Sequence, residues 1–162
     1  MSKERATRVR NTVTWLLYIL GGLLCFLALG AELIGLDFTP GFGIVQIVQL
    51  LVGITALTLA VYITLRSLRG PDAPRSLQAD IGIRLAATGL VFMYVSGLSD
   101  LIQIGTHVMP NFERPYIGPL QLGGLILGLV TIVAGLLLYH TSRGSRDHSS
   151  MEFLLQEGEN GD

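Results

Sequence analysis

The chain has 162 residues, of which 50% are hydrophobic and only 14% are charged, and its mean hydropathy is +0.57. Soluble domains average about 25% charged residues, so this composition excludes an ordinary soluble domain and indicates a protein that lies in a membrane. The net charge of −1 argues against general nucleic-acid binding, and the single cysteine, Cys25, excludes an internal disulfide and a cysteine zinc cluster.

The first predicted element is an apolar span over residues 14–35, preceded by a short basic segment over residues 1–13. The apolar run has about 22 residues, enough to cross the hydrocarbon core of a bilayer. A signal peptide has a shorter apolar core and a small-residue cleavage site. We therefore predict an uncleaved membrane helix.

A turn over residues 37–43 ends this span, because Pro40 and Gly41 break a helix. The second span is predicted over residues 44–65. A polar connection follows over residues 66–78, in which prolines prevent a continuous helix.

The third span is predicted over residues 81–108 and the fourth over residues 120–140, separated by a region, 109–119, that contains three prolines. Residues 141–162 are polar and end with several acidic residues, so we expect a mostly disordered tail. Four spans of this length use most of the chain and leave no room for a separate soluble domain. The predicted fold is an all-α integral membrane protein with a four-transmembrane-helix bundle.

A faint internal repeat relates the two halves of the chain at an offset of 75 residues. It matches Pro40, Gly43, Gln46 and Gly53 with Pro115, Gly118, Gln121 and Gly128. The chain is rich in glycine and leucine, so chance accounts for some of these matches. If the repeat is real, the protein consists of two parallel helical hairpins, an arrangement that favours a compact four-helix bundle.

Small residues mark the predicted contact sides of the helices. In the third span, small and polar residues recur at steps of four and three, which places them on one side of a helix. Small residues let membrane helices approach closely, because lipid supplies no hydrophobic drive for association. The predicted packing residues are Gly53, Gly82, Ala86, Gly89, Gly124, Gly128 and Gly135.

The distribution of arginine and lysine predicts the orientation of the spans. Segments 1–13, 66–78 and 141–162 are rich in these residues, whereas the other two connections are poor in them. Basic loops remain in the cytoplasm, so both termini are predicted to be cytoplasmic in the cell (inner) membrane. Asp80 lies four residues before Arg84 and can pair with it across one helical turn.

Six polar residues near the predicted outer face form a candidate pocket: Glu32, Gln46, Asp100, Gln103, His107 and Gln121. Carboxylates within a membrane are costly and often serve proton or ion transport, and an imidazole at the mouth could exchange protons with Asp100. The alternative is structural: Glu32 and His107 lie among lipid headgroups, and Asp100 bridges helices through Gln46 or Gln121.

No cofactor or metal site is predicted. The three histidines lie at different depths, so a bis-histidine haem is excluded, and phosphate-binding loops are absent from the sequence. A zinc site would require Glu32, Asp100 and His107 to converge, which their spacing does not indicate.

The favoured functional hypothesis is a non-enzymatic accessory or assembly subunit of a membrane complex, or a homo-oligomer. Its partners would be the lipid bilayer and either another membrane protein or a second copy. The first alternative is a small proton-coupled transporter that uses Asp100. The second is a quinone-binding membrane redox protein, with the quinone near His107 and Gln121.

Overall fold

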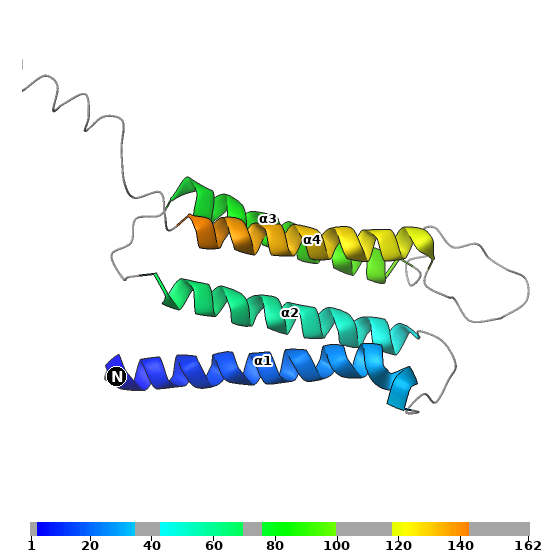
Figure 1. The fold of residues 1–162 in the computed structure, drawn as a ribbon, viewed down its shortest axis with the longest axis horizontal. Helices are drawn as coiled ribbons and strands as arrows, with labels where there is room; N and C mark the ends of the chain where they lie inside the picture. The colour runs from blue at the N-terminus through cyan, green and yellow to red at the C-terminus, as the bar shows by residue number, and fades with distance from the viewer. Residues whose placement is uncertain (1–2, 35–42, 70–75, 100–117, 143–162) are drawn as a thin grey trace, which may run out of the picture.

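A computed structural model describes residues 3–34, 43–69, 76–99 and 118–142 (Figure 1). In these ranges the chain forms four helices and no strand: α1 (Lys3–Ile34), α2 (Ile44–Ser67), α3 (Leu77–Gly97) and α4 (Pro119–Thr141). All four are long and apolar enough to cross a membrane. The predicted all-α fold with four membrane-spanning helices is confirmed.

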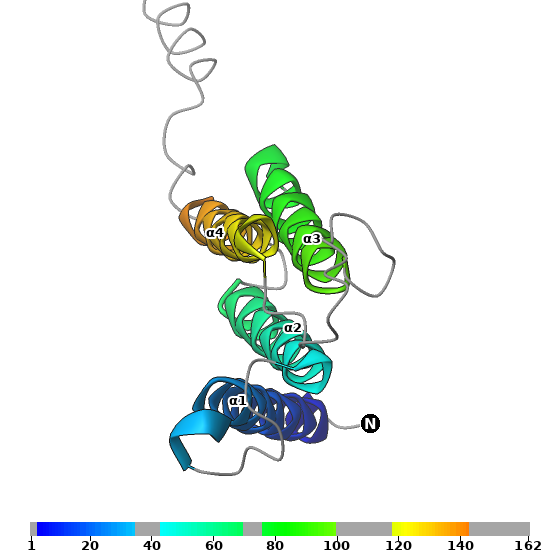
Figure 2. The ribbon, with the colours of Figure 1, turned by 90° about the vertical axis from the view of Figure 1, so that its right-hand side faces the viewer.

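The helices form two antiparallel hairpins that run in the same direction, α1 with α2 and α3 with α4 (Figure 1). Seen end-on, α1 is outermost, α2 lies beside it, and α3 and α4 lie together beyond α2 (Figure 2). Among the described helices, α2 is the only one that α1 contacts. The bundle is therefore open on the α1 side, whereas in a compact bundle each helix would have two neighbours.

Helix α1 begins at Lys3, well before the predicted span of residues 14–35. The first residues contain neither proline nor glycine, and once the apolar part has formed a helix, further residues extend it at little cost. The basic segment 1–13 is therefore helical from Lys3 onward. Helices α2 and α4 keep close to their predicted ranges of 44–65 and 120–140.

Helix α3 differs from its predicted range of 81–108 at both ends. It begins earlier because Ser76 caps it: the Ala79 N–H donates to the Ser76 hydroxyl over 3.2 Å. It ends at Gly97, where Gln121 of α4 donates its side-chain N–H to the Gly97 carbonyl over 3.2 Å. Residues 100–108 lie outside the described part of the chain.

The backbones of α3 and α4 touch at two levels. A Cβ added to Gly89 would lie 2.7 Å from the Gly128 carbonyl oxygen, and one added to Gly82 would lie 2.7 Å from the Gly135 carbonyl oxygen. Ala86 is buried beside Gly135 between these levels, and Gly124 faces the Ser96 side chain. All six small residues predicted for this pair of helices lie at their interface.

The contact between α1 and α2 uses fewer glycines. A Cβ at Gly53, the remaining predicted packing residue, would lie 3.0 Å from the Gly21 carbonyl oxygen and close to Cys25. Gly53 and Gly128 are 75 residues apart, as the repeat predicts, but their partners Gly21 and Gly89 are 68 apart. The register within the second hairpin therefore differs from that within the first: α3 is shifted along α4 by two helical turns, about 10 Å, compared with α1 along α2.

The two hairpins meet at an apolar junction made by α2, α3 and α4. Its buried side chains are Ile47, Leu51, Met93, Leu125 and Ile132. Leu51 and Met93 are the largest fully buried side chains in the described part of the chain. This junction lies toward the end of the bundle where α2 and α4 begin.

Candidate functional site

The six predicted pocket residues are only partly described by the structure. Gln46 and Gln121 lie in the first turns of α2 and α4. Glu32 belongs to α1, but its side chain lies outside the described part, as do Asp100, Gln103 and His107 entirely. The pocket itself therefore stays a prediction.

Gln46 and Gln121 perform the same local task. The Gly43 N–H donates to the Gln46 side-chain oxygen over 2.9 Å, and the Gly118 N–H donates to the Gln121 side-chain oxygen over 3.3 Å. Each glutamine thus satisfies a backbone donor at the start of its own helix, where the first N–H groups have no helical partner. The repeated Pro-x-x-Gly-x-x-Gln pattern thus ends in the same cap on both helices.

Gln121 also joins two helices. Gln121 is only 5% exposed, and its side-chain amide N–H donates to the Gly97 carbonyl at the end of α3. One side chain thereby satisfies the start of α4 and the end of α3. This bond within the second hairpin places Gln121 among the structural residues of the bundle.

Replacing Gln121 with leucine is expected to lower the free energy of unfolding by about 1–2 kcal/mol, because the Gly118 N–H and the Gly97 carbonyl each lose a partner away from water. The midpoint of thermal unfolding in detergent measures this effect. An unchanged midpoint would mean that the interhelical bond does not contribute to stability.

Other polar side chains in the spans also connect helices. The Tyr18 hydroxyl bonds the Thr64 hydroxyl at 3.2 Å, which links α1 to α2. The hydroxyls of Thr55 and Tyr94 lie 3.0 Å apart and link α2 to α3; because Thr55 already donates to the Leu51 carbonyl, Tyr94 is the donor. These bonds assign the described polar groups to helix packing.

Arg69, which follows the end of α2, forms a clasp on the end of α4. Its guanidinium donates to the Tyr139 carbonyl over 3.1 Å and to the Ser142 hydroxyl, and it lies 4.1 Å from the centre of the Tyr139 ring. Tyr62 packs on the same ring, with centroids 5.7 Å apart. A cation here is stabilised by the negative end of the α4 dipole.

The sequence does not predict the Arg69 clasp, because arginines in the connection 66–78 indicate only the orientation of the spans. The one available hint was the position of Arg69 just after a helix, at the end of the bundle where α4 also ends. The sequence around Arg69 does not indicate that Tyr139, 70 residues later, is its partner.

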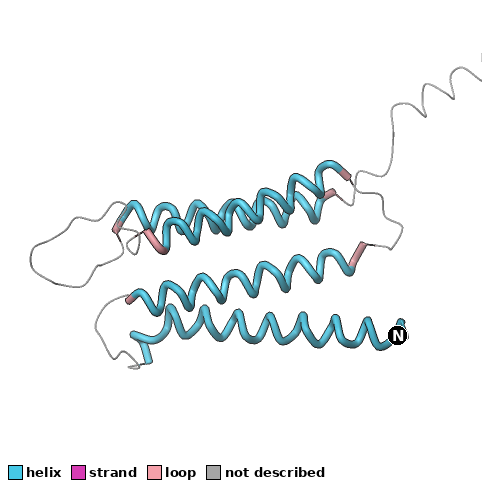
Figure 3. Tube along the Cα trace, turned by 180° about the vertical axis from the view of Figure 1, so that it is seen from behind, coloured by secondary structure: helices cyan, strands magenta, loops and turns pink. Residues whose placement is uncertain are grey.

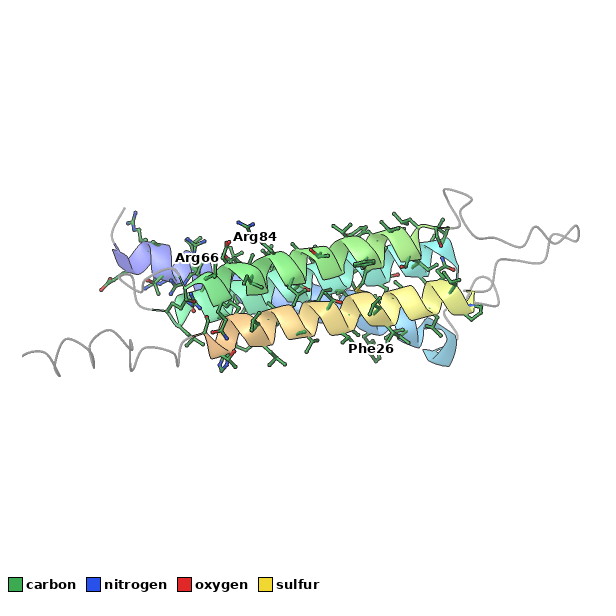
Figure 4. All side chains as sticks on the ribbon, turned by 90° about the horizontal axis from the view of Figure 1, so that it is seen from above. Phe26, Arg66 and Arg84 are labelled. Atoms are coloured by element: carbon green, nitrogen blue, oxygen red, sulfur yellow. The ribbon has the colours of Figure 1, made fainter. Side chains whose placement is uncertain are left out.

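Charged residues are concentrated at one end of the described bundle. Apart from Glu32, every Asp, Glu, Lys, Arg and His in the described ranges lies there: Lys3, Glu4, Arg5, Arg8, Arg10, Arg66, Arg69, Asp80, Arg84 and His140. Figure 4 shows Arg66 and Arg84 at this shared end. The predicted ion pair between Asp80 and Arg84 is present at 2.9 Å, on an exposed surface where it contributes little to stability.

Within the described residues, no three side chains of His, Cys, Asp or Glu come together in a way that could hold a metal ion. Comparison with protein-family models, with curated proteins and with solved structures finds no match to this chain. The polar contacts of the described part serve helix capping and helix packing.

Proposed function

We propose that this small membrane protein is a non-enzymatic accessory or assembly subunit, which binds a transmembrane helix of another protein along the outer face of α1. The observation that carries the proposal is that α1 contacts one neighbour only, α2. It is also the least buried of the four candidate spans. The remainder of its surface is left for lipid or for a partner.

The outer face of α1 has the shape of a helix-binding surface. At steps of four and three it presents Trp15, Ile19, Gly22, Phe26 and Leu29. A Cβ added to Gly22 would meet no atom within 4 Å, so this glycine is a notch among large side chains. Phe26 is 60% exposed and projects from the edge of the molecule (Figure 4).

A notch of this kind favours a helix over lipid alone. Helices in a membrane associate where small residues let their backbones approach, and large neighbours on either side fix the position of the partner. The glycines between α3 and α4 also let two backbones approach closely, but they are already covered by the facing helix of the same chain. Gly22 offers the same possibility of close approach on a surface that the described chain leaves uncovered.

The charged end of the bundle supports an orientation with both termini in the cytoplasm, because arginine-rich segments remain on that side of the cell membrane. In this orientation the outer face of α1 lies within the bilayer. It is therefore available to another membrane protein and inaccessible to a soluble one.

Native mass spectrometry of the protein, purified gently from its own membrane, tests the proposal. Companion membrane proteins at fixed stoichiometry would support the accessory-subunit role. A symmetric oligomer held along α1 would assign the same surface to a second copy. A lone monomer under conditions that preserve other membrane complexes would contradict both.

A leucine at Gly22 is expected to reduce recovery of the companion about tenfold or more, because a bulky side chain fills the notch at a cost of about 1.4 kcal/mol or more. Folding should be unaffected, since no chain atom lies near the new side chain. The matched control is Gly123→Leu on α4, another glycine with open space around it. Equal companion recovery in both variants would place the partner elsewhere.

A further inference from the structure

The first two turns of α1 reach the end of α2 and run past it. Gly21 lies against Gly53 and Leu57 in this antiparallel pair, so residues 3–10 of α1, here called the extension, lie level with or beyond Ser67, the last residue of α2. Figure 3 shows α1 continuing beyond the end of α2 at the N-terminus. Every side chain from Glu4 to Val13 is exposed.

The extension is the polar end of the candidate span Glu4–Gly30, and a bilayer boundary at Trp15 would leave it outside the hydrocarbon core. Trp15 packs edge-on against Tyr18, and aromatic residues of this kind sit at the boundary of the bilayer. From Trp15 to Ile34 a helix rises about 30 Å, the thickness of the hydrocarbon core. The headgroup layer adds only about 5–8 Å on each side, whereas Arg8 stands about 10 Å and Arg5 about 15 Å beyond Trp15.

One side of the extension is apolar with basic borders. Ala6 and Val9 lie one turn apart on this side, Val13 continues the stripe into the part of α1 that lies beside α2, and Val9 is 55% exposed. Arg5 and Arg10 lie on either side of this stripe. Within the described chain, none of the three arginines of the extension, Arg8 included, makes an ion pair. Such a surface fits an acidic segment that carries apolar side chains.

The C-terminal segment 151–162 has that chemistry. It carries Glu152, Glu157, Glu159 and Asp162 and no basic residue. It also contains a run of apolar residues, Met151 and Phe153–Leu155. We propose that this segment binds the extension of α1, with its apolar side chains on the stripe and its carboxylates beside the arginines, so that the two ends of the chain form one cytoplasmic surface.

The length of the chain permits this contact. Helix α4 ends at the same end of the bundle as the extension. Crossing from α4 past α2 to α1 takes two interhelical steps, about 20 Å. Residues 143–150 reach at most about 28 Å when extended. The chain's own acidic segment is the occupant, because its carboxylates complement the arginines of the extension and the chain is long enough to bring them there.

Cysteine cross-linking of the full-length protein in nanodiscs of zwitterionic lipid tests the contact. In a Cys25→Ser background, Ala6→Cys and Gln156→Cys should form a disulfide within one chain, detected as a mass loss of two hydrogens. Charge reversal of Arg5, Arg8 and Arg10 to glutamate should lower the cross-linking rate about fivefold, as expected from several weak exposed ion pairs. Restoring complementarity with Glu152→Lys, Glu157→Lys and Glu159→Lys should restore the rate.

The matched control is Arg84→Glu, a charge reversal at the same end of the bundle but on α3. This variant should cross-link at the unmodified rate. An unchanged cross-linking rate after charge reversal in the extension would overturn the proposal. Cross-links between two chains, instead of within one chain, would also overturn it. Neither result depends on whether a companion protein binds α1 inside the membrane.

Discussion

Replacing Gly89 with leucine is expected to destabilise the protein by about 3 kcal/mol or more, at the upper end of what overpacking costs. Even the first carbon of the new side chain would lie 2.7 Å from both the Gly128 carbonyl oxygen and the Ile132 nitrogen. These are backbone atoms of α4, so they can move only if the two helices separate. Separation would in turn break the second close contact, between Gly82 and Gly135.

The yield and the thermal unfolding midpoint of Gly89→Leu in detergent measure this effect. Gly123→Leu is the matched control, because it adds the same side chain to α4 where a Cβ meets no atom within 4 Å. We expect Gly123→Leu to match the unmodified protein and Gly89→Ala to fall between the two. A normal yield and midpoint for Gly89→Leu would refute the close contact of α3 with α4.

The pairing of α3 with α4 could be anticipated because it depends on the spacing of glycines, which can be seen in the sequence. Close approach of two backbones in lipid requires residues without side chains, so the glycines had to recur on one side of each helix. Gly82 and Gly89 do so in α3, and Gly128 and Gly135 do so in α4. The same argument could not show that α1 has a single neighbour, because its glycines are compatible with several partners.

The end of α3 at Gly97 could not be anticipated, because one of the groups that bond its last carbonyls lies in another helix. The pattern of small and polar residues runs past Gly97 without interruption and predicts a helix to residue 108. In the structure, Gln121 satisfies the Gly97 carbonyl, and the Ser99 hydroxyl donates to the Ser96 carbonyl over 2.8 Å. Local periodicity contains no information about such a tertiary cap.

The two halves of the predicted repeat have the same local structure at the starts of α2 and α4 but differ in helix register. A cap depends on three neighbouring residues, so Gly43 with Gln46 and Gly118 with Gln121 could be read from sequence alone. The register of a hairpin depends on which small residues meet across the interface. The difference of two helical turns between the registers of the two hairpins is therefore seen only in the contacts of Gly21 and Gly89.

Replacing Arg69 with alanine is expected to loosen the two hairpins from each other. Beyond the apolar junction and the bond between Thr55 and Tyr94, the clasp of Arg69 on α4 is the described polar contact that joins them. Its hydrogen bonds involve a charged donor, and its Nε lies buried, so the cation on the Tyr139 ring is partly shielded from water. Together these contacts contribute about 2–4 kcal/mol.

Spin labels at Ser67→Cys on α2 and His140→Cys on α4, in a Cys25→Ser background, would report the distance between the hairpins at this end. We expect a narrow distance distribution with Arg69 present and a broad one in Arg69→Ala. Arg69→Lys should be intermediate, because it keeps the charge but loses the planar fork that donates to two acceptors and stacks on a ring. Arg66→Ala is the control, since Arg66 is exposed one turn earlier and makes no ion pair in the described chain. If Arg69→Ala and Arg66→Ala gave equal distributions, the apolar junction and the other contacts between the hairpins would hold them together without the Arg69 clasp.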